Sequence, residues 1–233
     1  MSKVAVIGAT GKTGSLVVQS LTDAGFDVTG LVRNPAKART IEQFANINFE
    51  TFPLESTSVS KIALFLKDFD SVVFAAGVAD LSKHADVIQI ELDGAMKIIE
   101  ACEQAGVKRV VFISSIAASD RDFWYDNDYT RVYYTAKRTI DKVLERSMLD
   151  YTIVEPGPLV DEDGTGKIKI PKEAYQSAYE DFDFKENYYA LKVPRKDVAK
   201  AITLSLKNDK TIRKTLPLVQ GDTPIEKVIE DCL

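Results

Sequence analysis

Short apolar runs recur along the chain and alternate with segments in which apolar residues are spaced three or four positions apart. Most of the runs are rich in Val, Ile and Phe and show little alternation of polar and apolar residues, which is typical of strands buried on both faces. We predict six strands, over residues 4–7, 28–32, 47–51, 72–75, 110–114 and 151–154.

The segments between these runs carry helical patterns. An apolar stripe over 16–24 is followed by Gly25, and a second stripe over 88–102 is followed by Gly106. A glycine after the last periodic residue is a common helix stop signal. Strands separated by helix-length segments require right-handed crossovers, which build a parallel sheet. The pattern therefore predicts one α/β domain over residues 1–233 with a doubly wound parallel sheet.

Composition narrows the class of partner. The chain has 233 residues, 45% of them hydrophobic, and a formal net charge of −5. An acidic balance argues against nucleic acid as the main partner, because phosphates favour a concentrated positive field. The first apolar run is too short for a signal peptide or a membrane span. Cys102 and Cys232 show neither metal-ligand spacing nor a disulfide pattern. We expect a cytoplasmic protein that acts on a small molecule, with neither nucleic acid nor membrane as partner. The sequence leaves the oligomeric state open.

A polar segment over 161–193 interrupts the alternation. In open α/β sheets, ligands bind beyond the carboxyl ends of the strands, where such a segment can form a substrate wall or lid. We predict this substrate-side role, and the alternative is an insertion packed on the sheet edge. The segment is rich in aromatic residues, namely Tyr175, Tyr179, Phe182, Phe184, Tyr188 and Tyr189.

Three glycines stand at every third position between the first apolar run and the first helical stripe: Gly8, Gly11 and Gly14. Gly8 suits a tight turn, and Gly11 would let a pyrophosphate approach the main-chain amides. Gly14 would let the helix pack closely on the strand. The spacing is G-x-x-G-x-x-G, a variant of the usual fingerprint. Its place at the first strand–helix junction predicts the dinucleotide site of a Rossmann fold.

The end of the second predicted strand indicates which nucleotide binds. NAD sites usually offer an acidic residue there, whereas NADP sites offer an arginine. Arg33 and Asn34 follow the strand, Lys37 and Arg39 lie nearby, and Asp27 lies at the strand's beginning. Because a guanidinium can hold a phosphate with two hydrogen bonds, we predict NADP rather than NAD. The alternative is that Arg33 is a solvated loop charge.

A later helical pattern carries the candidate acid–base group. Tyr133 precedes Lys137 by four residues, so both lie on one helix face. A nearby ammonium stabilises tyrosinate and lowers the pKa of the phenol. Tyr134 is expected to point elsewhere. The preceding strand delivers Ser114 and Ser115 at its carboxyl end, where a hydroxyl can bind a substrate oxygen.

Six motifs, GATGKTG, LVRNP, VVFAAG, GVKRVVFISS, YYTAK and LDYTIVEPGPL, occur in this order. With them the chain resembles the short-chain dehydrogenases/reductases over nearly its whole length. It looks most like their atypical, NmrA-like subgroup of NAD(P)-binding or NAD-dependent epimerase/dehydratase-like proteins. The resemblance implies that Tyr133 is the general acid/base and that Lys137 holds the nicotinamide ribose and tunes Tyr133. Ser115, rather than Ser114, would polarise the substrate oxygen.

The same resemblance implies a set of cofactor-binding residues. Glu155 departs from the family, which often has arginine there, and the sequence FPLES over 52–56 replaces the usual Gly-Asp-Leu near the adenine. The set comes from the glycine loop, the ends of later strands and the helix of the acid–base group: Gly8, Thr10, Gly11, Lys12, Thr13, Gly14, Arg33, Asn34, Leu54, Glu55, Ala75, Ala76, Gly77, Lys137, Pro156 and Gly157.

These observations favour an NADP-dependent oxidoreductase that moves hydride between nicotinamide and a carbonyl or alcohol. Two alternatives stay open, because one fold hosts many functions. They are an NADP(H)-binding redox sensor that reports to a protein partner, and an epimerase or dehydratase that retains its cofactor. No metal is expected, since His84, the only histidine, has no cluster of ligands around it and suits a surface or capping position. Trp124 either lines the substrate pocket or anchors a loop.

Overall fold

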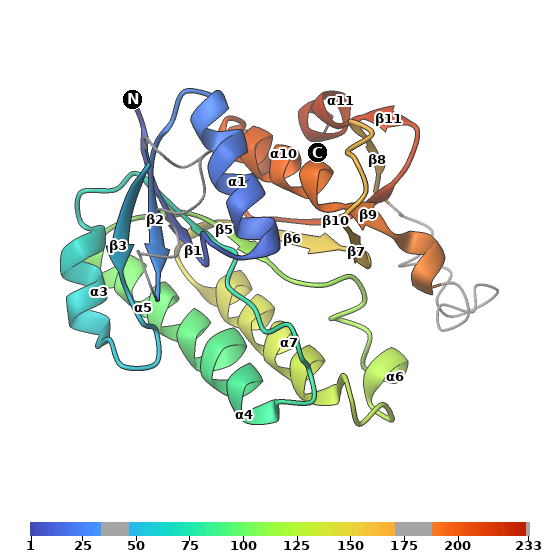
Figure 1. Cartoon of the computed structure of the whole chain (residues 1–233), viewed down its shortest axis with the longest axis horizontal. Coiled ribbons are helices and arrows are strands. Elements are labelled where there is room, and N and C mark those ends of the chain that lie inside the picture. Colours follow the sequence, from blue (N-terminus) through green and yellow to red (C-terminus); the bar gives the residue numbers. More distant parts are fainter. Residues whose placement is uncertain (34–46, 171–187, 232–233) are drawn as a thin grey trace.

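The computed structural model describes residues 1–33, 47–170 and 188–231, and a mostly parallel sheet forms its centre (Figure 1). The strands of this sheet are β1 (Lys3–Ile7), β2 (Asp27–Val32), β3 (Asn48–Thr51), β4 (Ser71–Phe74), β5 (Arg109–Ile113), β6 (Asp150–Pro156), β8 (Lys167–Lys169), β10 (Lys214–Gln220) and β11 (Thr223–Pro224). Their order is β11-β8-β10-β6-β5-β4-β1-β2-β3. From β3 to β10 every neighbouring pair is parallel. The predicted doubly wound sheet is therefore confirmed.

The six predicted strands correspond to β1 to β6, and their ends agree within two residues. The strand β10 was not predicted. Pro217 interrupts its apolar run, and a proline inside a run usually argues against a central strand. Here the run pairs with β6 on one side and with the short β8 on the other, close to the sheet edge, where a missing N–H is tolerated.

Helices cover both faces of the sheet (Figure 1). On one face lie α1 (Lys12–Asp23), α10 (Arg195–Leu206) and α11 (Ile225–Glu230), and on the other lie α3 (Val59–Leu66), α5 (Ala95–Ala105) and α7 (Arg131–Arg146). The chain enters α5 through α4 (His84–Asp86) and the π-helical segment η2 (Val87–Gly94). The short helices α6 (Arg121–Trp124), η3 (Tyr188–Leu191) and η4 (Asp209–Thr211) complete the described helices.

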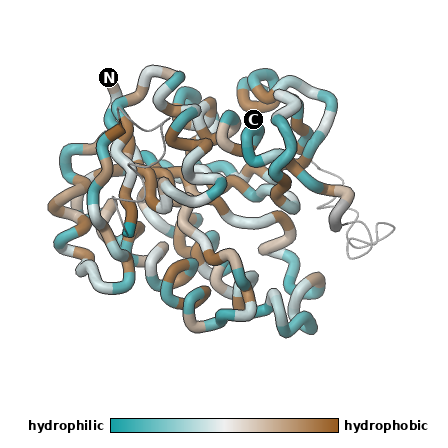
Figure 2. Tube along the Cα trace, in the orientation of Figure 1, coloured by the Kyte–Doolittle hydropathy of each residue, from teal (hydrophilic) through white to brown (hydrophobic). Residues whose placement is uncertain are grey.

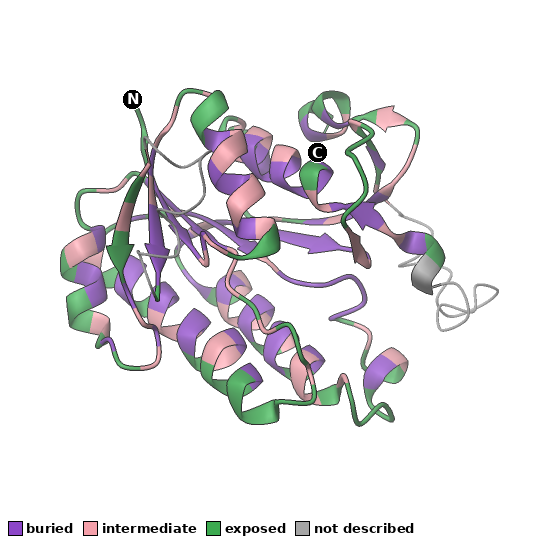
Figure 3. Cartoon of the chain, in the orientation of Figure 1, coloured by how far each residue is buried: buried purple, intermediate pink, exposed green. Residues whose placement is uncertain are grey.

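The sheet separates two apolar cores. Its inner strands are hydrophobic (Figure 2) and buried, whereas β3 at one edge and the outer helix faces are exposed (Figure 3). Successive side chains of a strand point to opposite faces. In β1, Val4 and Val6 enter the core beneath α1 and α10, and Ala5 and Ile7 enter the core beneath α3 and α5. A strand that feeds two cores has no polar position, which explains the uninterrupted apolar runs.

The described part of the segment 161–193 borders the sheet edge. At the two ends of the segment, β7 (Leu159–Val160) and β9 (Val193–Pro194) pair with each other. Within the segment, β8 pairs antiparallel with β10. Tyr175, Tyr179, Phe182 and Phe184 fall outside the described residues, and the substrate-side role stays a prediction.

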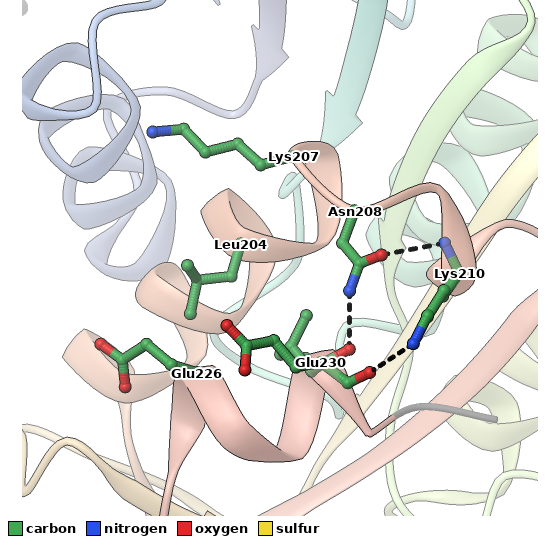
Figure 4. Close-up of a pocket in the computed structure, with 7 residues that line it drawn as sticks. Leu204, Lys207, Asn208, Lys210, Glu226 and Glu230 are labelled. Atoms are coloured by element: carbon green, nitrogen blue, oxygen red, sulfur yellow. Dashed lines mark hydrogen bonds between the residues drawn. The ribbon is translucent and has the colours of Figure 1, made fainter.

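A pocket of about 380 Å³ lies between the end of α10 and α11 (Figure 4). Its polar groups bond to the chain itself: Asn208 Nδ2 donates to the Ile229 carbonyl over 2.8 Å, and Lys210 Nζ donates to the Glu230 carbonyl over 3.2 Å. Arg195, the first residue of α10, pairs with Asp161, which also pairs with Lys12 beside the glycine loop. The 12 residues of α10 span about 18 Å from there to the pocket. The pocket is therefore remote from the predicted dinucleotide site.

Candidate active site

The glycine loop is built by close backbone packing between β1 and α1. Gly8 has φ +81°, and a Cβ there would lie 2.6 Å from the backbone of Ala76. A Cβ on Gly14 would lie 2.1 Å from the Gly8 carbonyl oxygen. Any larger residue at either position would overlap with backbone atoms that cannot move aside. The tight turn and the close helix–strand packing expected of Gly8 and Gly14 are both present.

The first turn of α1 fits a phosphate group. The helix follows Gly11, no side chain caps it, and no acidic residue lies in its first turn. The uncapped amides and the positive end of the helix dipole therefore favour an anion. At Gly11 a Cβ would lie 3.2 Å from the Gly8 carbonyl oxygen, so this glycine is less constrained by the fold than Gly8 or Gly14. The roles of Thr10 and Thr13 toward the cofactor stay predictions.

The side chain of Lys12 joins the glycine loop to the segment that follows β7. Its Nζ lies 2.6 Å from an Asp161 carboxylate oxygen, and Arg195 Nη1 lies 2.5 Å from the other oxygen. Hydrogen bonding to Lys12, assisted by Arg195, holds the pKa of Asp161 below its usual value. All three side chains are at least partly exposed, so these pairs contribute little to stability. They place a second cation, Arg195, close to the glycine loop.

The loop after β4 completes the wall beside the glycine loop. The strands β1 and β4 are neighbours at the point where the strand order reverses, and a crevice at the carboxyl ends of such strands is the usual ligand site. Ala75 donates its amide to the Ile7 carbonyl over 2.9 Å, and Ala76 packs on Gly8. A Cβ on Gly77 would lie 3.0 Å from Glu91 Oε1. The loop 75–77 therefore packs against the glycine loop, and its cofactor role stays a prediction.

On the predicted adenine side, Arg33 is close to an acidic residue. Its Nη1 lies 3.6 Å from Glu55 Oε1, and the arginine side chain is exposed. Leu54 is buried, and its carbonyl accepts a hydrogen bond from Lys97. Asn34 lies outside the described residues. Arg33 and Glu55 are both predicted cofactor-binding residues, but no pattern in the sequence indicates that they pair.

Lys137 and Tyr133 lie on one face of α7, as the spacing predicted. The Lys137 ammonium is 5.5 Å from the centre of the Tyr133 ring. It donates to the Ile113 carbonyl over 2.7 Å and forms an ion pair of 2.7 Å with Glu91. Burial by itself lowers the pKa of Lys137, but Glu91, together with Tyr133 and Asp141, outweighs it and raises the pKa above its ordinary value. A protonated lysine is therefore fixed beside the tyrosine.

Ser115 has a neighbour that was not expected. Its Oγ lies 3.5 Å from the hydroxyl of Tyr134, whose side chain is buried. The expectation that Tyr134 points away from this site is therefore wrong, because Tyr134 turns inward to stack on Trp124 and meet Phe123 edge-on. Trp124 donates its indole N–H to the Ala118 carbonyl and is buried. It anchors the loop between β5 and α7.

The remaining predicted residues lie at the ends of β5 and β6. Ser114 directly follows β5, and its amide still donates to the Val154 carbonyl of β6 over 2.7 Å. Pro156 ends β6, and a Cβ on Gly157 would lie 1.8 Å from the Leu191 carbonyl oxygen, so that this glycine is required by packing. Glu155 is buried within β6. His84 is exposed at the start of α4, as expected.

Two buried carboxylates, Glu91 and Asp141, were missed by the sequence analysis. Glu91 Oε1 accepts from the Val78 amide over 2.9 Å, and Asp141 Oδ2 accepts from Ser114 Oγ over 2.6 Å. An isolated acidic residue in an amphipathic helix usually marks the solvated face, so nothing in the sequence singles these two out. The structure places both beside Lys137.

Asp141 predicts a pH dependence of stability. Burial raises its pKa from 3.8 to about 7, although Ser114 and Lys137 oppose the rise. The folded protein therefore holds this proton more tightly than the unfolded chain, and the stabilisation present below pH 3.8 is lost as pH rises through about 7. We compare the unfolding free energy of Asp141→Asn with that of wild type at two pH values. The difference should shift in favour of the variant by on the order of 1–4 kcal/mol when the pH rises from about 4 to about 8. Urea unfolding at both pH values checks this, and an equal difference at both would contradict it.

The parallel sheet, its reversal at β1 and the glycine loop define a dinucleotide-binding Rossmann protein. Residues 8–209 match the model of the NAD(P)H-binding family, and the chain belongs to that family. Among the described residues there is no group of side chains arranged to hold a metal ion, and no helix long and apolar enough to cross a membrane.

Similar proteins agree with this assignment. The UPF0659 protein YMR090W of Saccharomyces cerevisiae is 36% identical over 231 residues, which cover 98% of this chain and 97% of the yeast protein. The uncharacterized sugar epimerase YhfK of Bacillus subtilis is 33% identical and covers 98% of this chain and 99% of its own. A solved structure from Bacillus halodurans, described as a NAD-dependent epimerase/dehydratase, has a TM-score of 0.84 at 33% identity and covers 99% of both chains. The chain is therefore part of a family of oxidoreductase- and epimerase-like proteins that bind NAD(P).

Proposed function

We propose that the protein is an NADP-dependent oxidoreductase that transfers hydride between nicotinamide and a carbonyl or alcohol. The observation that carries this proposal is the Lys137 ammonium, buried and fixed beside Tyr133. Ser115 follows the carboxyl end of β5, and β5 runs parallel to β4 and β1. Ser115 is therefore on the same edge of the sheet as the glycine loop. In this proposal the phenol of Tyr133, the ammonium of Lys137 and the hydroxyl of Ser115 would surround the nicotinamide end of the dinucleotide.

The chain's own residues suit such a cofactor. The uncapped amides at the start of α1 would hold the pyrophosphate, and Lys12 would join them by exchanging Asp161 for the phosphate. Lys137 has three N–H bonds, and its described partners, Glu91 and Ile113, take two of them. The third would bind a ribose hydroxyl. When bound, the nicotinamide supplies or accepts the hydride.

The proton follows a separate route through the protein. In the reducing direction, Tyr133 would donate its phenolic proton to the carbonyl oxygen of the substrate as that oxygen becomes an alcohol. The Lys137 ammonium would stabilise the tyrosinate that forms. Ser115 would donate a hydrogen bond to the same substrate oxygen, and its burial keeps that contact dry.

Arg33 supports NADP as the nucleotide, and its replacement tests this. Arg33→Ala should weaken NADPH binding about 10- to 100-fold, because a charged hydrogen bond to phosphate contributes about 1.5–3 kcal/mol. NADH binding should stay unchanged. The matched variant Glu55→Gln removes the carboxylate that competes for Arg33, and should tighten NADPH binding up to about fivefold. Nicotinamide fluorescence titrations of wild type and both variants measure these affinities. Equal wild-type affinities for NADPH and NADH would contradict the choice of NADP.

The names of two relatives favour a second candidate. YhfK is named a sugar epimerase, and the Bacillus halodurans protein is described as an epimerase/dehydratase. An enzyme of that kind would purify with nucleotide attached and would consume no NADPH overall. A screen of carbonyl compounds with NADPH separates the two. Tight NADPH binding without any turnover would instead indicate a redox sensor.

A further inference from the structure

Glu91 is a buried acid next to the proposed active site that the proposed reaction does not use. Its side chain is 2% exposed, and it lies in the π-helical segment η2, which packs against α7. Its two oxygens have different partners. Oε1 accepts from the Val78 amide over 2.9 Å, and Oε2 pairs with Lys137 Nζ over 2.7 Å. Short π-helical turns occur often at functional sites.

The ion pair with Glu91 fixes the position of the Lys137 ammonium and offsets part of its positive charge. The Ile113 carbonyl and Glu91 hold the ammonium from two sides. A charge buried this deeply requires a partner, because desolvation strongly disfavours an isolated ion. The ammonium is also 5.5 Å from the Tyr133 ring. The field that Tyr133 experiences therefore comes from the pair, and not from the lysine alone.

We propose that Glu91 is a positioning residue for the acid–base step: it orients the Lys137 ammonium and partly neutralises it, and so sets how readily Tyr133 gives up its proton. This proposal rests on the proposed function, in which Tyr133 donates the proton. A salt bridge with a merely structural role would stabilise the fold without affecting the ionisation of Tyr133.

The sign of the effect follows from the charges around Lys137. Glu91 on η2 and Asp141 and Tyr133 on α7 interact with the ammonium, and β5 contributes only the Ile113 carbonyl. Ile153 of β6 packs in the core beneath α7. Glu155 follows it by two residues in the same strand, so Glu155 also faces the α7 side of the sheet. Replacing Glu91 with glutamine leaves an acceptor for Val78 but removes one negative charge. The remaining cation should then favour tyrosinate at Tyr133.

The test is a tyrosinate titration by ultraviolet absorbance, on the full chain without nucleotide or substrate. The protein has nine tyrosines, so each variant is measured with and without Tyr133→Phe, and the difference isolates Tyr133. Glu91→Gln should lower the pH at which Tyr133 ionises by about one unit. Asp93→Asn is the matched control, because Asp93 also pairs with a lysine, Lys97, from the same helical segment but is half-exposed. It should leave the titration unchanged.

A second variant covers the case in which Glu91→Gln does not fold. Glu91→Asp keeps the charge but withdraws it from Lys137 by one methylene, and should shift the titration of Tyr133 in the same direction by a smaller amount. A folded Glu91 variant with the wild-type titration would overturn the proposal, and so would an equal shift in Asp93→Asn. Neither result depends on turnover, whereas a failure to reduce any carbonyl would contradict only the proposed function.

Discussion

Replacing Tyr133 with phenylalanine is expected to lower kcat about 100- to 10,000-fold, the usual contribution of a positioned general acid. The affinity for NADPH should change little, because the change removes only a hydroxyl and keeps the ring beside Lys137. Steady-state kinetics with a reducible carbonyl, combined with a binding titration, measure both effects. A variant that turned over as fast as wild type would show that Tyr133 is not the proton donor.

Tyr134 provides the matched control for this experiment. Its hydroxyl lies 3.5 Å from Ser115 Oγ, which is too long for a strong hydrogen bond. Its ring packs on Trp124, and phenylalanine would keep that packing. We therefore expect Tyr134→Phe to change kcat only a few-fold. If the large loss occurred in Tyr134→Phe instead, the acid–base role would belong to Tyr134.

The second large effect is on stability. Gly14→Ala should lower the free energy of unfolding by at least about 3 kcal/mol, the upper part of the range for overpacking. Its Cβ would lie 2.1 Å from the Gly8 carbonyl oxygen, a backbone atom of the turn that joins β1 to α1. Because natural domains are stable by only about 5–15 kcal/mol, part of the protein should unfold on mild heating. Urea unfolding measures the loss.

Gly25, at the other end of α1, is the control. It has φ +86°, and no other atom lies within 4 Å of the place that a Cβ would take, so Gly25→Ala meets only the backbone cost of that conformation. We expect a loss of about 1–2 kcal/mol. Equal losses in the two variants would contradict the close packing at Gly14.

The fold was largely predictable because β1, β2, β4, β5 and β6 are mostly buried, whereas β3 at the sheet edge is exposed. A strand such as Val4 to Ile7 admits no polar residue, and this makes the run visible in the sequence. The glycine loop was predictable for a related reason, since glycine is the only residue type that the backbone geometry accepts at positions 8 and 14. A structural feature can be predicted from the sequence where, as at Gly8 and Gly14, the local backbone accepts a single residue type.

The candidate site was less predictable where contacts join distant parts of the chain. The spacing of Tyr133 and Lys137 indicates a shared helix face, because both belong to one helix. It does not indicate that Glu91, on another helix, completes the pair. The inward turn of Tyr134 likewise depends on Trp124, which belongs to the preceding loop and helix. These are tertiary contacts, and no local pattern encodes them.

The central claim is that the amides of the glycine loop hold the phosphates of a dinucleotide. Gly11→Ala tests it most directly, because a Cβ there would lie 3.2 Å from the Gly8 carbonyl oxygen and leaves the fold nearly undisturbed. The methyl group would nevertheless occupy the approach to the first turn of α1. The decisive measurement is an NADPH titration of wild type and Gly11→Ala by nicotinamide fluorescence. The account predicts tight binding by wild type and at least about tenfold weaker binding by a folded Gly11→Ala, a difference of about 1.4 kcal/mol. Equal affinities in two folded proteins would contradict it.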